Sequence, residues 1–245
     1  MSTIFFLIQQ TMFFTIPLMV VALGGMFTER SGVINIALEG IMIMGGFCSI
    51  LFINMMQNNL SGQILLILAI IVAMISGAAF SMLHAYAAIN MKADQTISGT
   101  ALNMLAPALS IFMARMIQPS GVQQIQFTNT FRIEKVPLLG DIPLIGEMFF
   151  QNTYITTYFG VIILIISAVV LYKTKFGLRL RACGEHPQAA DAVGVSVYKM
   201  RYIGVAISGM LAGLGGLTFV VTTSTNFNAN VAGYGFLALA GLIFG

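Results

Sequence analysis

Long apolar runs separated by short polar segments make up nearly the whole chain, and this pattern predicts helices that cross a membrane. A membrane-spanning helix needs roughly 20 consecutive, mostly apolar residues. Six runs approach or exceed this length, and the polar segments between them hold most of the charged residues. The expected spans are residues 4–27, 36–56, 64–91, 97–117, 154–172 and 203–223.

The final run, residues 231–245, is too short to cross a bilayer by itself, since it offers only fifteen residues. A chain that ended at Gly245 would place a charged carboxylate at membrane depth, which is costly without a partner. We therefore expect a partial span here and a protein that continues past this residue. Residues 1–245 are interpreted as a single transmembrane domain.

Composition supports the same class. Of 245 residues, 58% are hydrophobic and 8% are charged, and the mean hydropathy is +0.93. Soluble domains carry about 25% charged residues, so a soluble protein is excluded. The expected fold class is an all-α, polytopic integral membrane bundle of helices.

The positive charge is concentrated in one polar segment. Lys173–Arg201 holds six of the eleven Lys and Arg residues, which argues for a topology signal and against nucleic-acid binding. Placing this loop in the cytoplasm puts Arg30 and Lys92 there too, giving eight basic residues inside. Three are then outside: Arg115, Arg132 and Lys135. The positive-inside rule therefore predicts an N-terminus outside the membrane.

Within this loop, the sequence predicts one short helix, from Pro187 to about Val193. Proline suits the first turn of a helix, and Gly194 suits the left-handed position after its end. An isolated helix shorter than about 12–15 residues is marginal in water. The segment is therefore either a helix that rests against a partner or an ordinary solvated turn.

Four blocks of sequence resemble the nucleoside and simple-sugar permeases of bacterial ABC importers, which are related to ribose and branched-chain amino acid permeases. The first is TKFGLRLRACGEHPQAADAVGV, followed by RYIGVAISGMLAGLGG, and it resembles the family's cytoplasmic coupling loop. The others are TERSGVINIALEGIMIMGGF, ADQTISGTALN and GYGFLALAGLIFG, at residues 28–47, 93–103 and 233–245. They follow the family's order along nearly the whole chain and look most like its nucleoside branch.

The resemblance implies a permease subunit in the bacterial cytoplasmic membrane that imports nucleosides. Its implied partners are an ABC ATPase subunit, a second permease subunit and an extracytoplasmic substrate-binding lipoprotein. The short loop helix would dock in a cleft of the ATPase, with Ala189, Ala190 and Ala192 keeping its docking surface small. The residues that match the family's coupling loop are Gly184, Glu185, Pro187, Ala190 and Gly194.

The sequence carries no catalytic constellation. No glycine-rich phosphate loop followed by Lys and Ser or Thr is present, so ATP hydrolysis is expected on a partner subunit. Cys48 and Cys183 lack the spacing of a metal site, and His84 and His186 have no nucleophile beside them. We expect neither an enzyme nor a cofactor or metal, and His84 is interpreted as a hydrogen-bonded interior histidine.

Polar residues inside the apolar runs are the candidates for a substrate pathway, because such groups are expensive in lipid. A helix break at Gly99 would free backbone groups for a solute, as in transporters with broken helices. Alternatively, these polar groups cap helices and bond to the backbone, and Glu39 fits an interfacial or interhelical carboxylate. The candidates are Asn35, Glu39, Asp94, Thr96, Ser98 and Asn103.

Small residues recur at i, i+3, i+4 and i+7 in the sixth span, at Gly209, Ala212, Gly213 and Gly216. Such a stripe lets helices approach closely, either within this subunit or at a dimer face. Two other functions remain open. An importer of a sugar or a branched-chain amino acid would differ only in the lining of the pathway. A stand-alone channel or ion-driven carrier would place paired ionisable groups in its spans, and these are scarce here.

Overall fold

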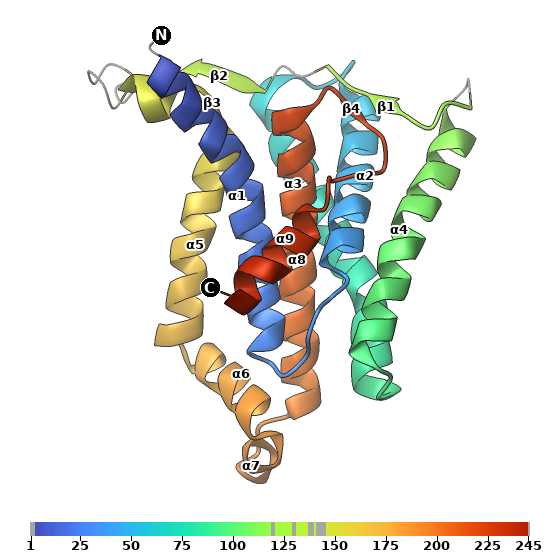
Figure 1. Ribbon diagram of the computed structural model, residues 1–245, viewed down its shortest axis with the longest axis vertical. Helices are drawn as coiled ribbons and strands as arrows, with labels where there is room; N and C mark the ends of the chain where they lie inside the picture. The colour runs from blue at the N-terminus through green and yellow to red at the C-terminus, as the bar shows by residue number, and fades with distance from the viewer. Residues whose placement is uncertain (1–2, 119–120, 129–130, 137–139, 141–145, 245) are drawn as a thin grey trace.

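The protein, described here from a computed structural model over residues 3–118, 121–128, 131–136, 140 and 146–244, is a bundle of long helices (Figure 1). Six helices of the described chain are long and apolar enough to cross a membrane. They are α1 (Thr3–Glu29), α2 (Leu38–Met56), α3 (Gly62–Ala85) with its π-helical extension η1 (Tyr86–Asn90), α4 (Gln95–Ile117), α5 (Ile155–Lys173) and α8 (Val197–Thr223). The expected all-α membrane fold is confirmed.

Short elements lie at the two ends of this bundle. At one end are α6 (Lys175–Glu185) and α7 (Pro187–Ala192), the lowest elements in Figure 1. The opposite end carries the N-terminus, the π-helix η3 (Gly146–Phe150) and two small antiparallel pairs, β1 with β4 and β2 with β3. These strands are β1 (Ile125–Gln126), β2 (Arg132–Lys135), β3 (Gln151–Tyr154) and β4 (Asn226–Phe227).

The core lies where α8 packs against α1, α2 and α3, and small residues set the distance between these helices. A Cβ on Gly77 of α3 would lie 2.9 Å from the Cα of Gly213, and one on Gly209 would meet the carbonyl of Gly77 at 2.6 Å. Gly216 lies equally close to the backbone of Met42 in α2. The small-residue stripe of α8 therefore faces α2 and α3 of the same chain.

The outer helices leave apolar surface uncovered. The most apolar part of α2 and of α8 is 72% buried, whereas the corresponding part of α4 and of α5 is only 28% buried. Met104 of α4 and Ile165 of α5 are among the large apolar side chains exposed on these helices. In a bilayer, such surfaces contact lipid or another transmembrane subunit.

Basic residues are divided unequally between the two ends. Arg30, Lys92 and the six residues of the 173–201 segment belong to the end that carries α7, which makes eight of eleven. The other end carries Arg115, Arg132 and Lys135. The structure thus places the predicted inside and outside groups of charges at opposite ends of one bundle.

The last helix, α9 (Tyr234–Phe244), begins part of the way down the bundle and lies against α1 and α2 (Figure 1). It has eleven residues, so the described part of this run is not a full span.

Candidate functional site

The segment between α1 and α2, residues 30–37, is not helical, and its side chains reach into the bundle. Asn35 is only 2% exposed. Its Nδ2 donates to Oγ of Ser208 in α8 at 3.0 Å, and its Oδ1 accepts from the N–H of Ala37 at 3.1 Å. Buried polar groups are normally hydrogen-bonded, and this pair fastens the α1–α2 segment to α8.

Two other helices hold the same segment at Ile34. The ring of buried His84 in α3 lies 3.1 Å from the Ile34 carbonyl through Nε2 and 3.1 Å from Oγ of Ser98 through Nδ1. The Ile34 N–H donates to Oε1 of Gln95 in α4 at 2.7 Å. A carbonyl can only accept, so neutral His84 carries its proton on Nε2. The interpretation of His84 as a hydrogen-bonded interior residue is confirmed.

Asn103 of α4 caps α2 from outside that helix. Its Oδ1 accepts from the N–H of Gly40 at 2.7 Å, and its Nδ2 donates to the Ile36 carbonyl at 2.8 Å. The residue at the start of α2, Ala37, makes no side-chain cap of its own. Asn103 therefore satisfies backbone groups that a helix end leaves open.

The predicted helix break at Gly99 is wrong, because α4 runs without interruption from Gln95 to Ile117. Gly99 instead allows close packing. A Cβ there would lie 2.8 Å from the Cβ of Ile36 and 3.1 Å from the N atom of Ala37. The chain leaves helical structure before α4, at residues 91–94.

Asp94 and Thr96 lie at that interruption, on the surface. Asp94 is the N-cap of α4, and its Oδ1 accepts from the N–H of Thr96 at 2.7 Å and of Ile97 at 3.1 Å. Hydrogen bonds from Ile97 and then Thr96 lower the pKa of the Asp94 carboxyl below its ordinary value. Capping accounts for the role of Asp94 in the fold.

Glu39, in the first turn of α2, joins α2 to α9. Its Oε1 accepts from the N–H of Gly233 at 3.0 Å and its Oε2 from that of Gly235 at 2.6 Å. The carboxylate therefore lies at the N-terminus of α9, where a negative charge is favoured. The interpretation of Glu39 as an interhelical carboxylate is confirmed.

Three of the six pathway candidates thus gather around the start of α2: Asn35, Glu39 and Asn103. Ser98 joins them through His84, while Asp94 and Thr96 lie apart at the surface. Ser208 was missed from the sequence. It is a polar residue directly before the small-residue stripe of α8, and that position was the available signal.

A small cavity of about 90 Å³ adjoins this cluster. Asn35 and Ile34 line it from the α1–α2 segment, and Gly25 and Glu29 line it from α1. Three apolar residues of α9 complete it: Leu239, Leu242 and Ile243. Ligand sites usually measure about 300–1,000 Å³, so this cavity is too small to enclose a nucleoside-sized solute.

At the α7 end, α6 and α7 form a helical pair. Oγ1 of Thr174 caps α6 by accepting from the N–H of Gly177 at 3.2 Å, and Leu180 and Cys183 are buried on its inner face. The short loop helix is present as α7, with proline at its start, and Gly194 has φ +82°. The left-handed conformation expected after this helix is confirmed.

The expected exposure of Ala190 on the docking surface is wrong, since this residue is only 4% exposed. It lies on the inner side of α7, which packs on α6 and α8. Ala189, Asp191 and Ala192 are exposed, and Val193 is 79% exposed. A six-residue helix has only one or two turns, so its inner face is needed to hold it in place.

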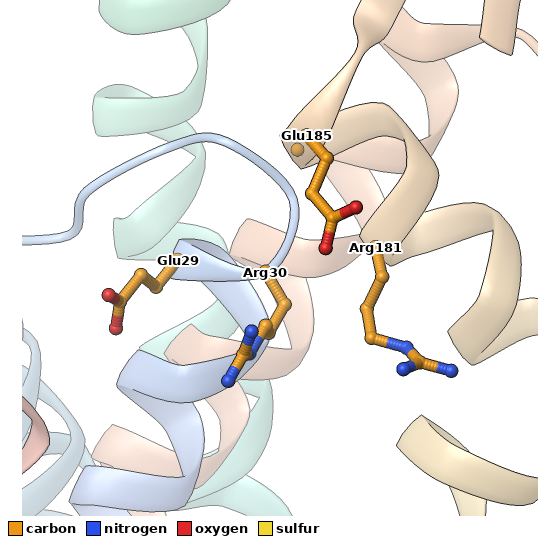
Figure 2. A pocket seen from close by; sticks show the side chains of 5 residues that line it. Glu29, Arg30, Arg181 and Glu185 are labelled. Atoms are coloured by element: carbon orange, nitrogen blue, oxygen red, sulfur yellow. The ribbon is translucent and has the colours of Figure 1, made fainter. Parts of the chain in front are cut away.

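A charged pocket of about 220 Å³ separates the end of α1 from the end of α6 (Figure 2). Glu29 lines it from the end of α1, Arg30 from the start of the α1–α2 segment, and Arg181 and Glu185 from α6. Arg181 lies over the ring of Tyr172, 5.3 Å from its centroid, and its buried Nε has no hydrogen-bond partner among the described residues. The pocket therefore presents charge of both signs close to α7.

At the edge of this pocket, the backbone of α6 contacts the backbone of the α1–α2 segment. A Cβ on Gly184 would lie 2.6 Å from the carbonyl oxygen of Arg30 and 3.1 Å from the N atom of Gly32. Arg201 of α8 closes the junction, with its Nε donating to the Ser31 carbonyl at 3.3 Å. The helical pair that carries α7 is thus in direct contact with the segment that holds Asn35.

Comparison with known proteins agrees with this architecture. Residues 7–245 match the family described as "Branched-chain amino acid transport system / permease component". The chain is 46% identical over 240 residues to the guanosine ABC transporter permease protein NupQ of Bacillus subtilis, across 98% of this chain and 75% of the relative. It is 41% identical over 245 residues to the nucleoside ABC transporter permease protein NupC of Lactococcus lactis, across 100% of this chain and 76% of the relative.

A more distant relative is named for a different solute. The chain is 32% identical over 232 residues to the putative glucose ABC transporter permease protein TsgC13 of Haloferax volcanii, across 93% of this chain and 66% of the relative. No solved structure matches the chain. The match over residues 7–245 and the six membrane-spanning helices agree, and the chain belongs to this family of transport-system permease components.

Proposed function

We propose that this chain is the permease subunit of an ABC importer that moves nucleosides across the bacterial cytoplasmic membrane. The observation that carries the proposal is 46% identity, along 98% of the chain, to a permease whose name gives guanosine as its solute. A second relative named for nucleosides supports the same solute class. Residues 1–245 then act as a single permease domain.

The orientation follows from the charge distribution. The end that carries α7, with eight of the eleven basic residues, faces the cytoplasm, and the N-terminus and the short strands face outward. An extracytoplasmic binding protein delivers the solute to the outward end. A second permease subunit covers part of the exposed apolar surface of this chain and completes the pathway.

ATP hydrolysis occurs on a separate subunit, which docks on the exposed face of α7. Ala189 and Ala192 keep that face narrow, Asp191 gives it charge, and exposed Glu185 adds a second carboxylate at the adjoining end of α6. Closure of the ATPase pair then moves α7 and α6 as a rigid unit. The coupling residues are those named from the sequence, with Ala190 acting as a packing residue of α7.

The contact of Gly184 with residues 30–32 carries that movement into the bundle. Because the two backbones touch, a shift of α6 displaces the α1–α2 segment directly. The displaced segment holds Asn35, and it is tied to α3, α4 and α8 by hydrogen bonds. The substrate pathway runs beside this cluster at the start of α2, where polar groups are available to a solute once the helices separate.

Uptake by cells that express the complete transporter tests the solute class. Radiolabelled guanosine should enter in an energy-dependent manner, and removal of this chain should abolish uptake. Excess unlabelled nucleosides should compete, whereas glucose and leucine should not. Competition by glucose alone would instead favour the sugar importer that the Haloferax relative suggests. Uptake that persists without the companion ATPase would support a stand-alone channel or carrier.

A further inference from the structure

A basic pocket on the α7 end of the bundle lies outside the proposed pathway and shares Arg201 with the junction between α6 and the α1–α2 segment. It lies between the end of the third span and the start of α8, and its volume is about 190 Å³. Lys92 and Arg201 supply its charge, and Tyr198 supplies an aromatic wall. Three small or branched apolar residues complete the lining: Ala88, Ile89 and Val197.

The two cations have no counter-charge of their own. In the described residues, no ion pair joins Lys92 or Arg201 to a carboxylate. The nearby Asp94 carboxylate lines the adjoining groove, and its Oδ1 accepts from the N–H groups at the start of α4. Two basic side chains on one pocket attract an anion, and a planar guanidinium suits phosphate oxygens in particular.

Specific contacts hold the two helices that form the pocket in place. Tyr202 of α8 donates a 2.5 Å hydrogen bond to Oδ1 of Asn90, which fixes α8 to the end of η1. Beneath it, Val33, Ile89 and Val205 belong to a small buried apolar cluster. Lys92 has φ +52°, a conformation that non-glycine residues seldom adopt and that often marks a functional position.

The pocket lies at the level in the membrane where lipid headgroups are expected. The pocket lies at the ends of two membrane spans, where basic and aromatic residues meet the bilayer surface. Ala87, the chain neighbour of Ala88 in the same π-helix, lines a second, largely apolar groove of about 450 Å³ between α3 and α4. Leu83, Met91 and Ile97 are among its other lining residues. A phosphate and an acyl chain therefore find suitable surfaces side by side.

We propose that this pocket binds the phosphate of an anionic phospholipid, with one acyl chain in the adjoining groove. The volume of about 190 Å³ is below the range of drug-sized ligands and suits a small headgroup. Basic pockets between membrane helices on the cytoplasmic side are typical sites for anionic lipid headgroups. This inference rests on the membrane placement of the spans and is independent of the transported solute.

Lipid binding to the purified, complete transporter tests the proposal. Phosphatidylglycerol and phosphatidylcholine are titrated separately, and bound lipid is counted by native mass spectrometry. We expect phosphatidylglycerol to bind more tightly, and Lys92→Gln to weaken it about fivefold, as expected for one basic residue at a membrane surface. Lys92→Arg should restore binding, which separates loss of charge from loss of folding.

Lys199→Gln is the matched control, because Lys199 is exposed in the first turn of α8 but does not line the pocket. Equal binding of both lipids, or equal effects of Lys92→Gln and Lys199→Gln, would overturn the proposal. Displacement of the lipid by millimolar inorganic phosphate would indicate a soluble phosphate site instead. If Lys92→Gln releases the ATPase subunit and leaves lipid binding unchanged, the pocket is a protein contact and the lipid assignment fails.

Discussion

Gly184 at the end of α6 lies against Gly32 in the α1–α2 segment so closely that a Cβ at either position would meet the other segment at less than ordinary van der Waals distance. A Cβ on Gly32 would lie 3.2 Å from the Cα of Gly184, and one on Gly184 would lie 2.6 Å from the carbonyl oxygen of Arg30. Gly32 also has φ +81°, which favours glycine. In the proposed mechanism, this contact transmits the movement of α7 to the inside of the bundle.

Adding one methyl group at this contact should impair coupling. Gly184→Ala forces the two backbones apart, and overpacking of this kind typically costs about 1–3 kcal/mol. We expect reduced guanosine uptake and reduced solute-stimulated ATP hydrolysis, with the transporter still assembled. Gly241→Ala is the control, since a Cβ there meets nothing within 4 Å. Normal coupling in Gly184→Ala would show that this contact does not transmit motion.

A charge on the outer face of α7 should prevent docking of the ATPase without disturbing the fold. Ala189 is exposed, so Ala189→Arg places its guanidinium in solvent when the subunit is alone. We expect normal amounts of the variant in the membrane, loss of uptake and loss of the ATPase on purification. Gln124→Arg makes a similar change at the opposite end of the bundle and should have no effect.

Ala190→Arg should behave differently from Ala189→Arg, because Ala190 is buried and the new charge would be forced into the packing of α7. We expect a lower thermal midpoint in detergent as well as lost uptake. If Ala189→Arg transports normally with the ATPase bound, the exposed face of α7 is not the docking surface.

Asn103 should contribute to stability, whereas Thr96 should not. Asn103→Ala leaves the N–H of Gly40 and the carbonyl of Ile36 without their partner, and each unsatisfied buried group costs about 1–3 kcal/mol. Thr96 is exposed, and surface substitutions usually change stability by less than about 0.5 kcal/mol. Thermal unfolding of both variants measures the difference. A similar midpoint for the two would argue against the capping role of Asn103.

Single cysteines should report the orientation of the bundle. In a chain whose Cys48 and Cys183 are replaced by serine, a membrane-impermeant thiol reagent added to intact cells should label Gln124→Cys. It should not label Gln188→Cys until the cells are permeabilised, because eight of the eleven basic residues lie at that end. Both positions are exposed in the structure. Labelling of Gln188→Cys alone would invert the proposed topology.

The amino-acid sequence by itself determined where the spans lie. Transfer of apolar surface into lipid depends on the residues of each run and hardly on their neighbours, so each of the six expected spans coincides with a helix. The start and end of α7 were equally local, because proline and glycine restrict or free the backbone at their own positions. The helix α6 was not predicted, although Phe176, Leu180 and Cys183 recur on one face at helical spacing.

Only the tertiary structure decided what the polar residues contact. Asn103 caps backbone groups of Ile36 and Gly40 that lie more than sixty residues earlier in the chain, and Asn35 finds its partner at Ser208, 173 residues away. Gly99 packs against another segment instead of breaking its helix, and Ala190 turns inward because α6 and α8 lie there. A hydrogen bond or a close backbone contact depends on what lies opposite a residue in space, and the local pattern of hydrophobic and polar positions does not contain that information.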